Sequence, residues 1–439
     1  MVYEELRAKI ESRSARAGVI GLGYVGLPLA LAYVDAGYEV VGYDVDPAKI
    51  EELRAGRSYL GDVASARVAA AVEAGRFEAT ADPARLAAAD VVAICVPTPL
   101  TPENEPDLSF LESTAETLAS QLRPGQLVIV ESTVYPGATR EVVLPLLERG
   151  GLRAGADFWL AFSPERVDPG NPAYPLAEIP TVVGGTDDAA TELAAAFYEP
   201  VVREVVKVSS AETAEMSKLL ENTYRAVNIA LVNELKIICD RLGLDVFEVI
   251  AAAATKPYGF QEFRPGPGVG GHCIPLDPYY LAWRAKQVGH ESRFVELAGR
   301  VNAAMPAYVV ARLREALTAR GREVDGAQVL ILGVTYKANV DDLREAPALA
   351  VIDLLLREGA AVTYHDPYAP ALPKTRKYDF GLTSVPLAAE TLRAVDAVVI
   401  VSDHTSVDYD AVFREASLVV DTRGVARRLG YAGDNVVTA

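Results

Sequence analysis

A glycine-patterned turn near the N-terminus constrains the fold of this chain more than any other feature. The run ARAGVIGLGYVGLPLALAYVDAGYEVVGYDVD covers residues 15–46. It reads as an apolar strand, a G-x-G-x-x-G turn, a helix that stops at Gly37 and a second strand that ends at Asp44. In this register the elements form a complete βαβ unit, so the N-terminal part of the chain is predicted to be α/β.

The same unit predicts a dinucleotide site. The first glycine makes the tight turn, the second lets a pyrophosphate meet the backbone, and the third lets helix and strand pack closely. The pyrophosphate sits on the helix N-terminus, where free N–H groups favour negative charge. A carboxylate at the end of the second strand binds the adenosine ribose and repels a 2′-phosphate, so NAD is favoured over NADP. The predicted cofactor-binding residues of this unit are Gly21, Gly23, Tyr24, Val25, Gly26 and Asp44.

A second glycine-rich segment, GPGVGGHCIPLD at residues 266–277, places Cys273 four residues before Asp277. Glycines let a ligand approach the backbone closely, and a thiolate held there can attack an electrophilic carbon. A small buried hydrophobe in a packed loop is the commoner fate of a free cysteine. The segment alone does not favour either interpretation. The dinucleotide unit earlier in the chain favours a nucleophilic cysteine over a buried core residue.

Composition narrows the classes of function. A chain of 439 residues, half of them hydrophobic, is expected to hold two or three domains. A net charge of −18 argues against nucleic acid or an anionic membrane as main partner. No apolar run reaches membrane-spanning length and residues 1–17 lack a secretory pattern, so a cytoplasmic protein is expected. Three widely spaced cysteines indicate neither a disulfide framework nor a metal site.

The pattern of elements predicts three domains. Apolar strands within residues 89–97, 125–133 and 158–162 extend the first βα array, giving a domain of residues 1–205. One long helix then runs to Gly243 and helical sequence continues, giving a central domain of residues 206–320. A helix of that length spans domains or pairs with a copy of itself, so a homodimer is predicted.

A second α/β array, residues 321–439, contains strands near residues 327–333, 360–366, 396–402 and 417–424, with a helix near residues 348–358. Its first loop, GVTYKANVDDLREAP, replaces the tight glycine turn and offers Lys337 and Arg344 for phosphate or uridine contacts, unless both are solvated charges. The predicted fold is α/β: two Rossmann-like doubly wound domains joined by a long central helix and a helical domain.

Taken together, seven motifs make the chain resemble the UDP-glucose/GDP-mannose dehydrogenase family over essentially its whole length. They are GVIGLGYVGLPLA, CVPTP at residues 95–99, ESTVYPG at 131–137, FSPERVDPG at 162–170, SKLLENTYRA at 217–226, GHCIPLDP, and GVTYKANVDDLRE. The resemblance implies that two NAD⁺ oxidise the C6 hydroxymethyl of a nucleotide sugar to a carboxylate. It also implies a setting in surface-polysaccharide synthesis.

The resemblance also assigns roles to residues. A water held by Thr133 and Glu165, with Lys218 alongside, takes the hydroxyl proton, and Cys273 then binds the aldehyde covalently. Asp277 assists proton transfer at the thioester stage, while Lys218 and Asn222 stabilise the oxyanion. Pro97, Thr98 and Thr133 are expected at the cofactor. The expected substrate contacts are Glu165, Arg166, Val167, Lys218, Asn222, Arg225, Tyr258, Arg264, Gly270, Lys337 and Arg344.

Independently of the family, Lys218, Asn222 and Arg225 stand at i, i+4 and i+7 of one helix and so share a face. An ordinary solvated helix face is the alternative without the family match. Cys95 and Cys239 are expected to be inert core, and His290, His365 and His404 to be surface or strand-end residues.

The substrate is expected to be an acetamido sugar. The UDP-glucose branch of the family typically has a lysine where this chain has Leu276, and GHCIPLDPYYLAWRAK is more similar to enzymes acting on UDP-N-acetylhexosamines, above all UDP-N-acetylglucosamine. UDP-N-acetylmannosamine and UDP-glucose are alternatives. A catalytically silent NAD-binding protein and a two-electron 2-hydroxyacid or 6-phosphogluconate-type dehydrogenase remain open as other classes.

Overall fold

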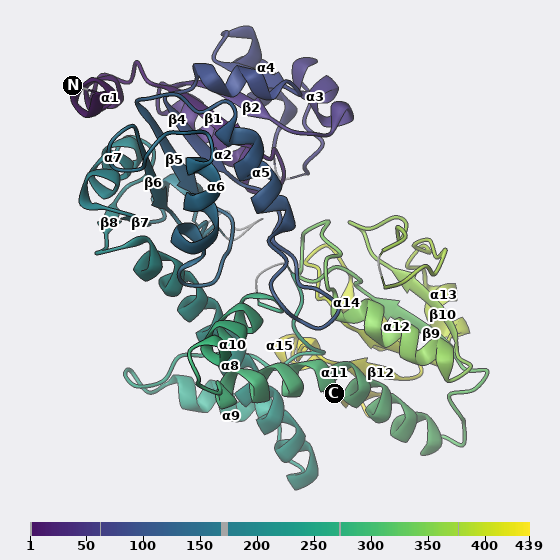
Figure 1. Cartoon of the computed structure of the whole chain (residues 1–439). Coiled ribbons are helices and arrows are strands. Elements are labelled where there is room, and N and C mark those ends of the chain that lie inside the picture. Colours follow the sequence, from purple (N-terminus) through teal and green to yellow (C-terminus); the bar gives the residue numbers. More distant parts are fainter. Residues whose placement is uncertain (1, 62, 168–173, 272–273, 376) are drawn as a thin grey trace. The chain divides into compact units, whose positions relative to one another are not determined.

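The structure is a computed structural model that describes residues 2–61, 63–167, 174–271, 274–375 and 377–439. Contacts divide the chain into two compact units, Met1–Glu221 with Tyr279–His290 and Asn222–Pro278 with Glu291–Ala439. Each unit contains one largely parallel sheet, and the longest helices lie between the two sheets in the sequence (Figure 1). The predicted α/β class with two Rossmann-like regions is confirmed, while the exact domain limits stay predictions.

The first unit contains an eight-stranded sheet in the order β3-β2-β1-β4-β5-β6-β7-β8. All neighbouring strands pair in parallel except β6 and β7. The order reverses direction between β1 and β4, which is where doubly wound sheets bind ligands beyond the carboxyl ends of their strands. The strands are β1 Arg16–Ile20, β2 Glu39–Tyr43, β3 Phe77–Thr80, β4 Val91–Ile94, β5 Gln126–Val130, β6 Phe158–Phe162, β7 Thr181–Gly185 and β8 Val205–Lys207.

Both faces of this sheet are covered. Leu127 and Ile129 of β5 belong to one apolar cluster and Val128 and Val130 to another, because successive side chains point to opposite faces. Strands such as β5, which is buried throughout and apolar except for Gln126, are typical of sheets with helices on both sides. The helices of this unit are α1 Val2–Glu11, α2 Gly26–Asp35, α3 Pro47–Arg54, α4 Ser65–Glu73, α5 Ser109–Ala119, α6 Leu144–Glu148 and α7 Asp188–Tyr198, with short turns at Pro83–Ala88, Thr139–Val143 and Leu176–Glu178.

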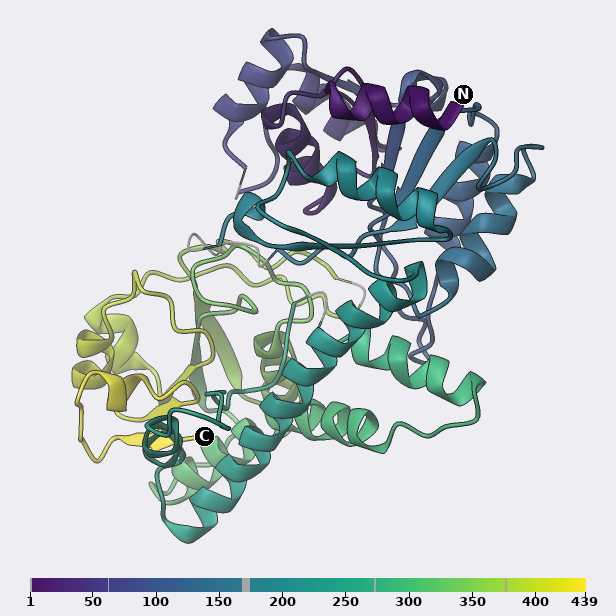
Figure 2. The ribbon, with the colours of Figure 1, turned by 90° about the vertical axis from the view of Figure 1, so that its left-hand side faces the viewer.

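The long central helix, α8, runs from Ala211 to Leu242 (Figure 2). It contains neither glycine nor proline and ends where Gly243 takes a φ of 71°, a conformation that glycine adopts without strain. The predicted long helix is therefore confirmed. The further central helices are α9 Val246–Ala254, α10 Asp277–Gln287 and α11 Arg293–Thr318.

The second unit contains a five-stranded parallel sheet in the order β10-β9-β11-β12-β13. Its direction reverses between β9 and β11, and its strands also alternate between two apolar clusters. The strands are β9 Gln328–Leu332, β10 Ala361–His365, β11 Ala397–Ile400, β12 Val419–Asp421 and β13 Val436–Thr438; the helices are α12 Pro347–Arg357, α13 Ala389–Ala394, α14 Tyr409–Glu415 and α15 Val425–Arg428. Among the described residues, no helix combines the length and apolar character needed to span a membrane.

Candidate active site

The glycine turn after β1 has the shape that a pyrophosphate requires. A side chain at Gly26 would lie 1.8 Å from the carbonyl oxygen of Gly21, so helix and turn can meet only through glycine. A side chain at Gly23 would meet nothing within 4 Å, which leaves its backbone open to a ligand. The exposed fraction of Tyr24 beside it is 39%. These residues fit a bound dinucleotide.

Asp44 stands at the end of β2 and faces this turn. Its Oδ2 accepts the Leu22 backbone N–H at 2.8 Å and lies 3.1 Å from Lys49 Nζ, and its Oδ1 accepts the Asp46 N–H at 3.0 Å. Because two segments of backbone and a lysine fix the carboxylate, its orientation is set before any ribose arrives.

Thr98 follows β4 and Thr133 follows β5. These strands lie beyond the point between β1 and β4 where the strand order reverses. Both threonines are buried, whereas Pro97 is exposed. The Thr98 carbonyl oxygen accepts the Tyr280 hydroxyl at 2.9 Å, so α10 holds the loop after β4 in place. Gly21, Asp44, Thr98 and Thr133 therefore all lie at the carboxyl edge of one sheet, as the sequence predicts.

Glu165 and Lys218 meet at the same edge, after β6. The Lys218 ammonium donates to the Glu165 backbone carbonyl oxygen at 2.9 Å, and the Lys218 side chain is buried. Burial raises the pKa of the Glu165 carboxyl, although the Val167 N–H and the charge of Lys218 oppose the rise. A carboxylate with a raised pKa is a stronger base near neutrality than a solvated one. Arg166 donates to the Pro180 carbonyl oxygen at 2.6 Å and pairs with Glu221 at 2.9 Å.

Sequence reasoning missed Glu131, a carboxyl buried at the end of β5. It lines a small pocket together with Ser163, Glu165 and Tyr198, and the Tyr198 hydroxyl donates to it. Burial and the neighbouring Glu165 raise the pKa of Glu131 to about 8. A glutamate directly after an apolar strand resembles a solvated strand end, so only the burial reveals it.

In the second unit, Asn222 and Asp277 are joined directly. Asn222 Nδ2 donates to Asp277 Oδ2 at 2.6 Å, and both side chains are buried. Asp277 is the first residue of α10, where a carboxylate is favoured by the free N–H groups of the helix. Arg225, expected on the same face of α8 as Lys218 and Asn222, is exposed.

The glycine loop that precedes Cys273 contacts the loop after β9. The Gly271 N–H donates to the Arg344 carbonyl oxygen at 2.9 Å, and a side chain at Gly270 would lie 2.8 Å from the Glu345 carbonyl oxygen. Tyr258 is 73% exposed. The exposed Arg264 pairs with Glu262 at 2.7 Å. Cys273 and the neighbouring His272 lie outside the described residues.

Three family models match consecutive parts of this chain. The NAD binding domain of the UDP-glucose/GDP-mannose dehydrogenase family matches residues 15–202, its central domain residues 212–304 and its UDP binding domain residues 330–428. The chain belongs to this family.

Relatives agree over nearly the whole chain. Protein CapL of Staphylococcus aureus is 38% identical over 414 residues, 93% of this chain and 95% of the relative. The UDP-N-acetyl-D-glucosamine 6-dehydrogenase of Pseudomonas aeruginosa is 38% identical over 395 residues, 90% and 91% of the two chains. The solved UDP-D-ManNAc dehydrogenase of Pyrococcus horikoshii is 34% identical with a TM-score of 0.87 and covers 96% of this chain and 98% of its own. Family membership makes this chain an NAD-dependent UDP-sugar dehydrogenase.

The UDP binding domain carries cations at the carboxyl edge of its sheet. Lys337 lies half-buried in the loop after β9, and the Arg344 guanidinium pairs with Asp342 at 2.6 Å. Sequence reasoning missed Arg423, which follows β12; its Nε donates to the Val401 carbonyl oxygen at 2.7 Å, and burial lowers its pKa. The rule that ligands bind at the carboxyl ends of parallel strands would have found it, since it follows an evident strand.

His404 was expected at the surface or a strand end. It follows β11, but its side chain is completely buried against Asp366, so the surface alternative was wrong. By contrast, Cys95 and Cys239 are buried, as expected of core cysteines. Among the described residues, no three His, Cys, Asp or Glu side chains gather closely enough to hold a metal ion.

Replacing Asp44 with alanine is expected to raise the KM for NAD about tenfold and to relax discrimination against NADP. The variant loses the carboxylate at the predicted ribose position and frees the Lys49 ammonium for a 2′-phosphate, each an effect of about 1–2 kcal/mol. Initial rates with NAD and NADP measure both effects. The control is Asp82→Ala, which removes a capping carboxylate one strand further along the same edge. Unchanged cofactor kinetics in Asp44→Ala would place the ribose elsewhere.

Replacing Glu131 with glutamine is expected to stabilise the protein at alkaline pH. The pKa of Glu131 is raised from 4.5 to about 8, so the stability it contributes is present below about pH 4.5 and is lost as the pH rises through about 8. Glutamine imitates the neutral acid and should reduce this loss by up to about 1.4 kcal/mol per pH unit. Urea unfolding at about pH 5 and 8.5 tests it, with the exposed Glu73→Gln as control. Equal pH dependence in variant and parent would contradict the raised pKa.

Proposed function

We propose that this dehydrogenase oxidises UDP-N-acetylglucosamine to UDP-N-acetylglucosaminuronate. The observation that carries the proposal is the 38% identity over 395 residues to an enzyme of that name. Leu276, in place of the lysine typical of the UDP-glucose branch, agrees with it. The overall reaction converts the sugar CH₂OH, two NAD⁺ and one water into the carboxylate, two NADH and three protons.

The first step needs a base at the C6 hydroxyl. Thr133 and Glu165 are proposed to hold a water that takes the hydroxyl proton, with bound NAD supplying the acceptor for the hydride. Burial of Glu165 supports this role, because it raises the proton affinity of the carboxylate. Lys218 limits that rise, since its ammonium lies against the backbone of the same residue.

The second step is proposed to be covalent. The Cys273 thiolate adds to the aldehyde carbon and forms a thiohemiacetal, which keeps the aldehyde in place and presents its C–H for the second oxidation. The thioester that results is hydrolysed by water, which returns the thiolate. The hydrogen bond between Asn222 and Asp277 supports a joint role, in which Asn222 stabilises the oxyanion and orients the carboxylate that moves the proton.

The substrate is proposed to contact two neighbouring loops of the second unit, the glycine loop that precedes Cys273 and the loop that carries Lys337. The Gly271 N–H donates to the Arg344 carbonyl oxygen, so the loop that precedes Cys273 and the loop that carries Lys337 are in contact. The loop before Cys273 can therefore bind the sugar of a ligand while the Lys337 loop binds its UDP. The proposed contacts remain Glu165, Arg166, Val167, Lys218, Asn222, Arg225, Tyr258, Arg264, Gly270, Lys337 and Arg344.

UDP-N-acetylmannosamine is the second candidate substrate. It is favoured by the likeness to the Pyrococcus horikoshii UDP-D-ManNAc dehydrogenase, with a TM-score of 0.87. The two sugars differ only in configuration at C2, so the difference lies in how the acetamido group is seated.

The yield of NADH at completion, with each UDP-sugar limiting, tests substrate and mechanism together. Two equivalents from UDP-N-acetylglucosamine and fewer from UDP-N-acetylmannosamine and UDP-glucose are expected. Two equivalents from another sugar alone would overturn the substrate but keep the mechanism. One equivalent would indicate that the aldehyde escapes. No NADH from any of the three would require tests of other nucleotide sugars, and a lack of NADH from those too would favour a silent NAD-binding protein.

We also infer a homodimer built on α8. Leu231, Leu235, Ile238 and Leu242 repeat at intervals of three or four residues and are each at least 38% exposed. A continuous apolar stripe of this kind is typical of a surface covered by another helix, and a copy of the same helix offers matching side chains.

Light scattering at micromolar concentration is expected to give the mass of a dimer. The double variant Leu231→Glu/Leu235→Glu should give a monomer, because it places charges on the stripe. The matched control is Leu356→Glu, which changes an exposed leucine of α12 outside the stripe. A parent protein that is monomeric at this concentration would refute the interface.

A further inference from the structure

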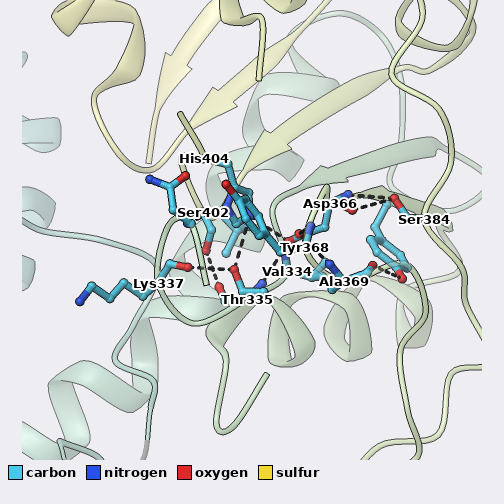
Figure 3. Close-up of polar contacts among 12 residues, drawn as sticks. Val334, Thr335, Lys337, Asp366, Tyr368, Ala369, Ser384, Ser402 and His404 are labelled. Carbon is cyan, nitrogen blue, oxygen red and sulfur yellow. Dashed lines mark hydrogen bonds and ion pairs between the residues drawn. The ribbon is translucent and has the colours of Figure 1, made fainter. Parts of the chain in front are cut away.

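A completely buried Asp–His pair lies at the carboxyl edge of the second sheet (Figure 3). His404, which follows β11, has its Nε2 atom 2.9 Å from Oδ2 of Asp366, which follows β10. The Tyr368 ring lies over the imidazole with the ring centroids 5.0 Å apart. Neither member of the pair belongs to the residues assigned to substrate or cofactor above.

The hydrogen bonds define the form of the imidazole. His404 Nδ1 lies 2.9 Å from the backbone nitrogen of Asn339, which can only donate, so Nδ1 is an acceptor. Nε2 therefore carries the hydrogen and donates it to Asp366, with Thr335 Oγ1 at 3.4 Å as a second neighbour. A neutral ring satisfies this network, whereas a doubly protonated ring would place two donors face to face at Nδ1.

Asp366 is held just as firmly on its other sides. Its Oδ2 accepts the N–H groups of Val334 at 2.6 Å and Thr335 at 3.3 Å, while its Oδ1 accepts those of Tyr368 at 2.8 Å and Ala369 at 3.1 Å. Burial alone would raise the pKa of Asp366, but the hydrogen bonds from His404 and the backbone lower it.

The pair fastens the loop that carries Lys337 at both ends. Before Lys337, the backbone of Val334 and Thr335 donates to Asp366; after it, the backbone of Asn339 donates to His404. Within the loop, Thr335 Oγ1 donates to the Lys337 carbonyl oxygen at 2.9 Å. Asn339 Oδ1 also accepts the Thr405 N–H at 2.9 Å, which ties the loop to the segment of His404 itself.

Asp366 corresponds to Asp44 in the first unit. Each follows the second strand of its βαβ unit and accepts an N–H from the loop after the first strand, Leu22 in one case and Val334 in the other. In the first unit the carboxylate is partnered by a lysine near the surface, but in the second the imidazole of His404 covers it. The second carboxylate therefore organises a loop instead of facing a ribose.

We propose that His404 is a positioning residue for the nucleotide-sugar site. Its neutral imidazole accepts from Asn339 and donates to Asp366, and these two hydrogen bonds, the His404 clasp, hold the Lys337 loop so that Lys337 faces the diphosphate of UDP. This rests on the proposed function, in which Lys337 contacts the substrate. His404 itself touches neither substrate nor cofactor. It acts through the conformation of the loop.

Two variants separate the halves of the clasp. His404→Asn can place its amide oxygen near the position of Nδ1 and accept from Asn339, whereas His404→Gln can place its amide nitrogen near the position of Nε2 and donate to Asp366 but leaves the Asn339 N–H without an acceptor. We expect Gln to raise the Kd for UDP roughly 10- to 100-fold, and Asn to raise it no more than about fivefold. The KM for the UDP-sugar should follow, with kcat and the Kd for NAD nearly unchanged.

Calorimetric titration of each full-length variant with UDP, and then with NAD as the measure of a folded first unit, gives the result. His365→Asn is the matched control, because that histidine ends β10 and its Nδ1 lies 2.8 Å from the carbonyl oxygen of Val385, a residue outside the Lys337 loop. Asn339→Gly, at an exposed position with a φ of 65°, removes the hydrogen bonds from Thr405, keeps the backbone N–H that donates to His404, and should weaken UDP binding about fivefold. It keeps the test decisive should both His404 variants fold poorly.

Lys337→Ala separates the proposed contact of Lys337 with UDP from the proposed positioning role of His404. If it leaves the Kd for UDP unchanged, the proposed substrate contact of this loop is wrong. If Lys337→Ala weakens UDP binding while His404→Gln and Asn339→Gly do not, the contact stands and the clasp is overturned. Equal losses in His404→Asn and His404→Gln would also overturn it, because the acceptor at Nδ1 would then be irrelevant.

Discussion

Replacing Cys273 with serine is expected to lower overall turnover about 10³-fold or more while leaving the affinity for NAD unchanged. A serine hydroxyl has a far higher pKa than a thiol, so it is a much weaker nucleophile and would not hold the aldehyde for the second oxidation. The residues proposed for NAD belong to the other unit of the chain, and no role in cofactor binding is proposed for the thiol. The measurements are NADH yield from UDP-N-acetylglucosamine and the Kd for NAD.

The control separates this thiol from the buried cysteine of α8. Cys239→Ala truncates a buried side chain of α8, so it should cost some stability but keep two equivalents of NADH per sugar. The serine variant is expected to give one equivalent at most, because the first oxidation does not need the thiol. Two equivalents at the parent rate would remove the covalent step and leave Cys273 as a packed loop residue.

The first sheet could be predicted because several independent patterns agree along it. The first strand, the glycine turn, the helix and Asp44 all require the same register, and each predicted strand that follows is centred on a short apolar run. The position of each ligand-side residue then follows from topology alone, since parallel strands end at one edge. Asp44, Thr98, Thr133 and Glu165 lie there for this reason.

Short elements without such agreement could not be predicted. β7 and β13 consist of five and three residues, and β7 pairs with β6 in the antiparallel sense, which no periodicity in the sequence signals. Their strand character depends on neighbours far away in the chain. Alternation of hydrophobic residues indicates a strand, but pairing with neighbouring strands decides whether a short segment forms one.

Burial of polar side chains is the second kind of information that the sequence lacks. The helical period correctly relates Lys218, Asn222 and Arg225 by angle, yet the first two are buried and the third is exposed. Likewise, His404 lies far in sequence from both Asp366 and Asn339, its hydrogen-bond partners. A buried network of this kind is fixed by tertiary contacts, so residue type and spacing alone suggested a surface or strand-end histidine.

Replacing Lys218 with methionine is expected to lower kcat about 10²- to 10³-fold, the usual effect of removing one oxyanion-stabilising group. Methionine keeps most of the length and apolar character of the buried side chain, so the helix should remain packed. The ammonium also lowers the pKa of Glu165. Its loss should therefore raise that pKa and move the acid limb of the kcat profile to higher pH, because the base must be deprotonated to act.

The pH profile distinguishes the two roles proposed for Lys218. Lys207→Met is the matched control, since Lys207 is exposed and pairs only with Glu192 among its described ion-pair partners. A lower rate with an unshifted acid limb would assign Lys218 to the oxyanion alone and detach it from the first step. A shifted limb with a nearly normal rate at high pH would place its effect on Glu165. Both changes together are expected, because one ammonium lies against Glu165 and stands one helical turn from Asn222 on α8.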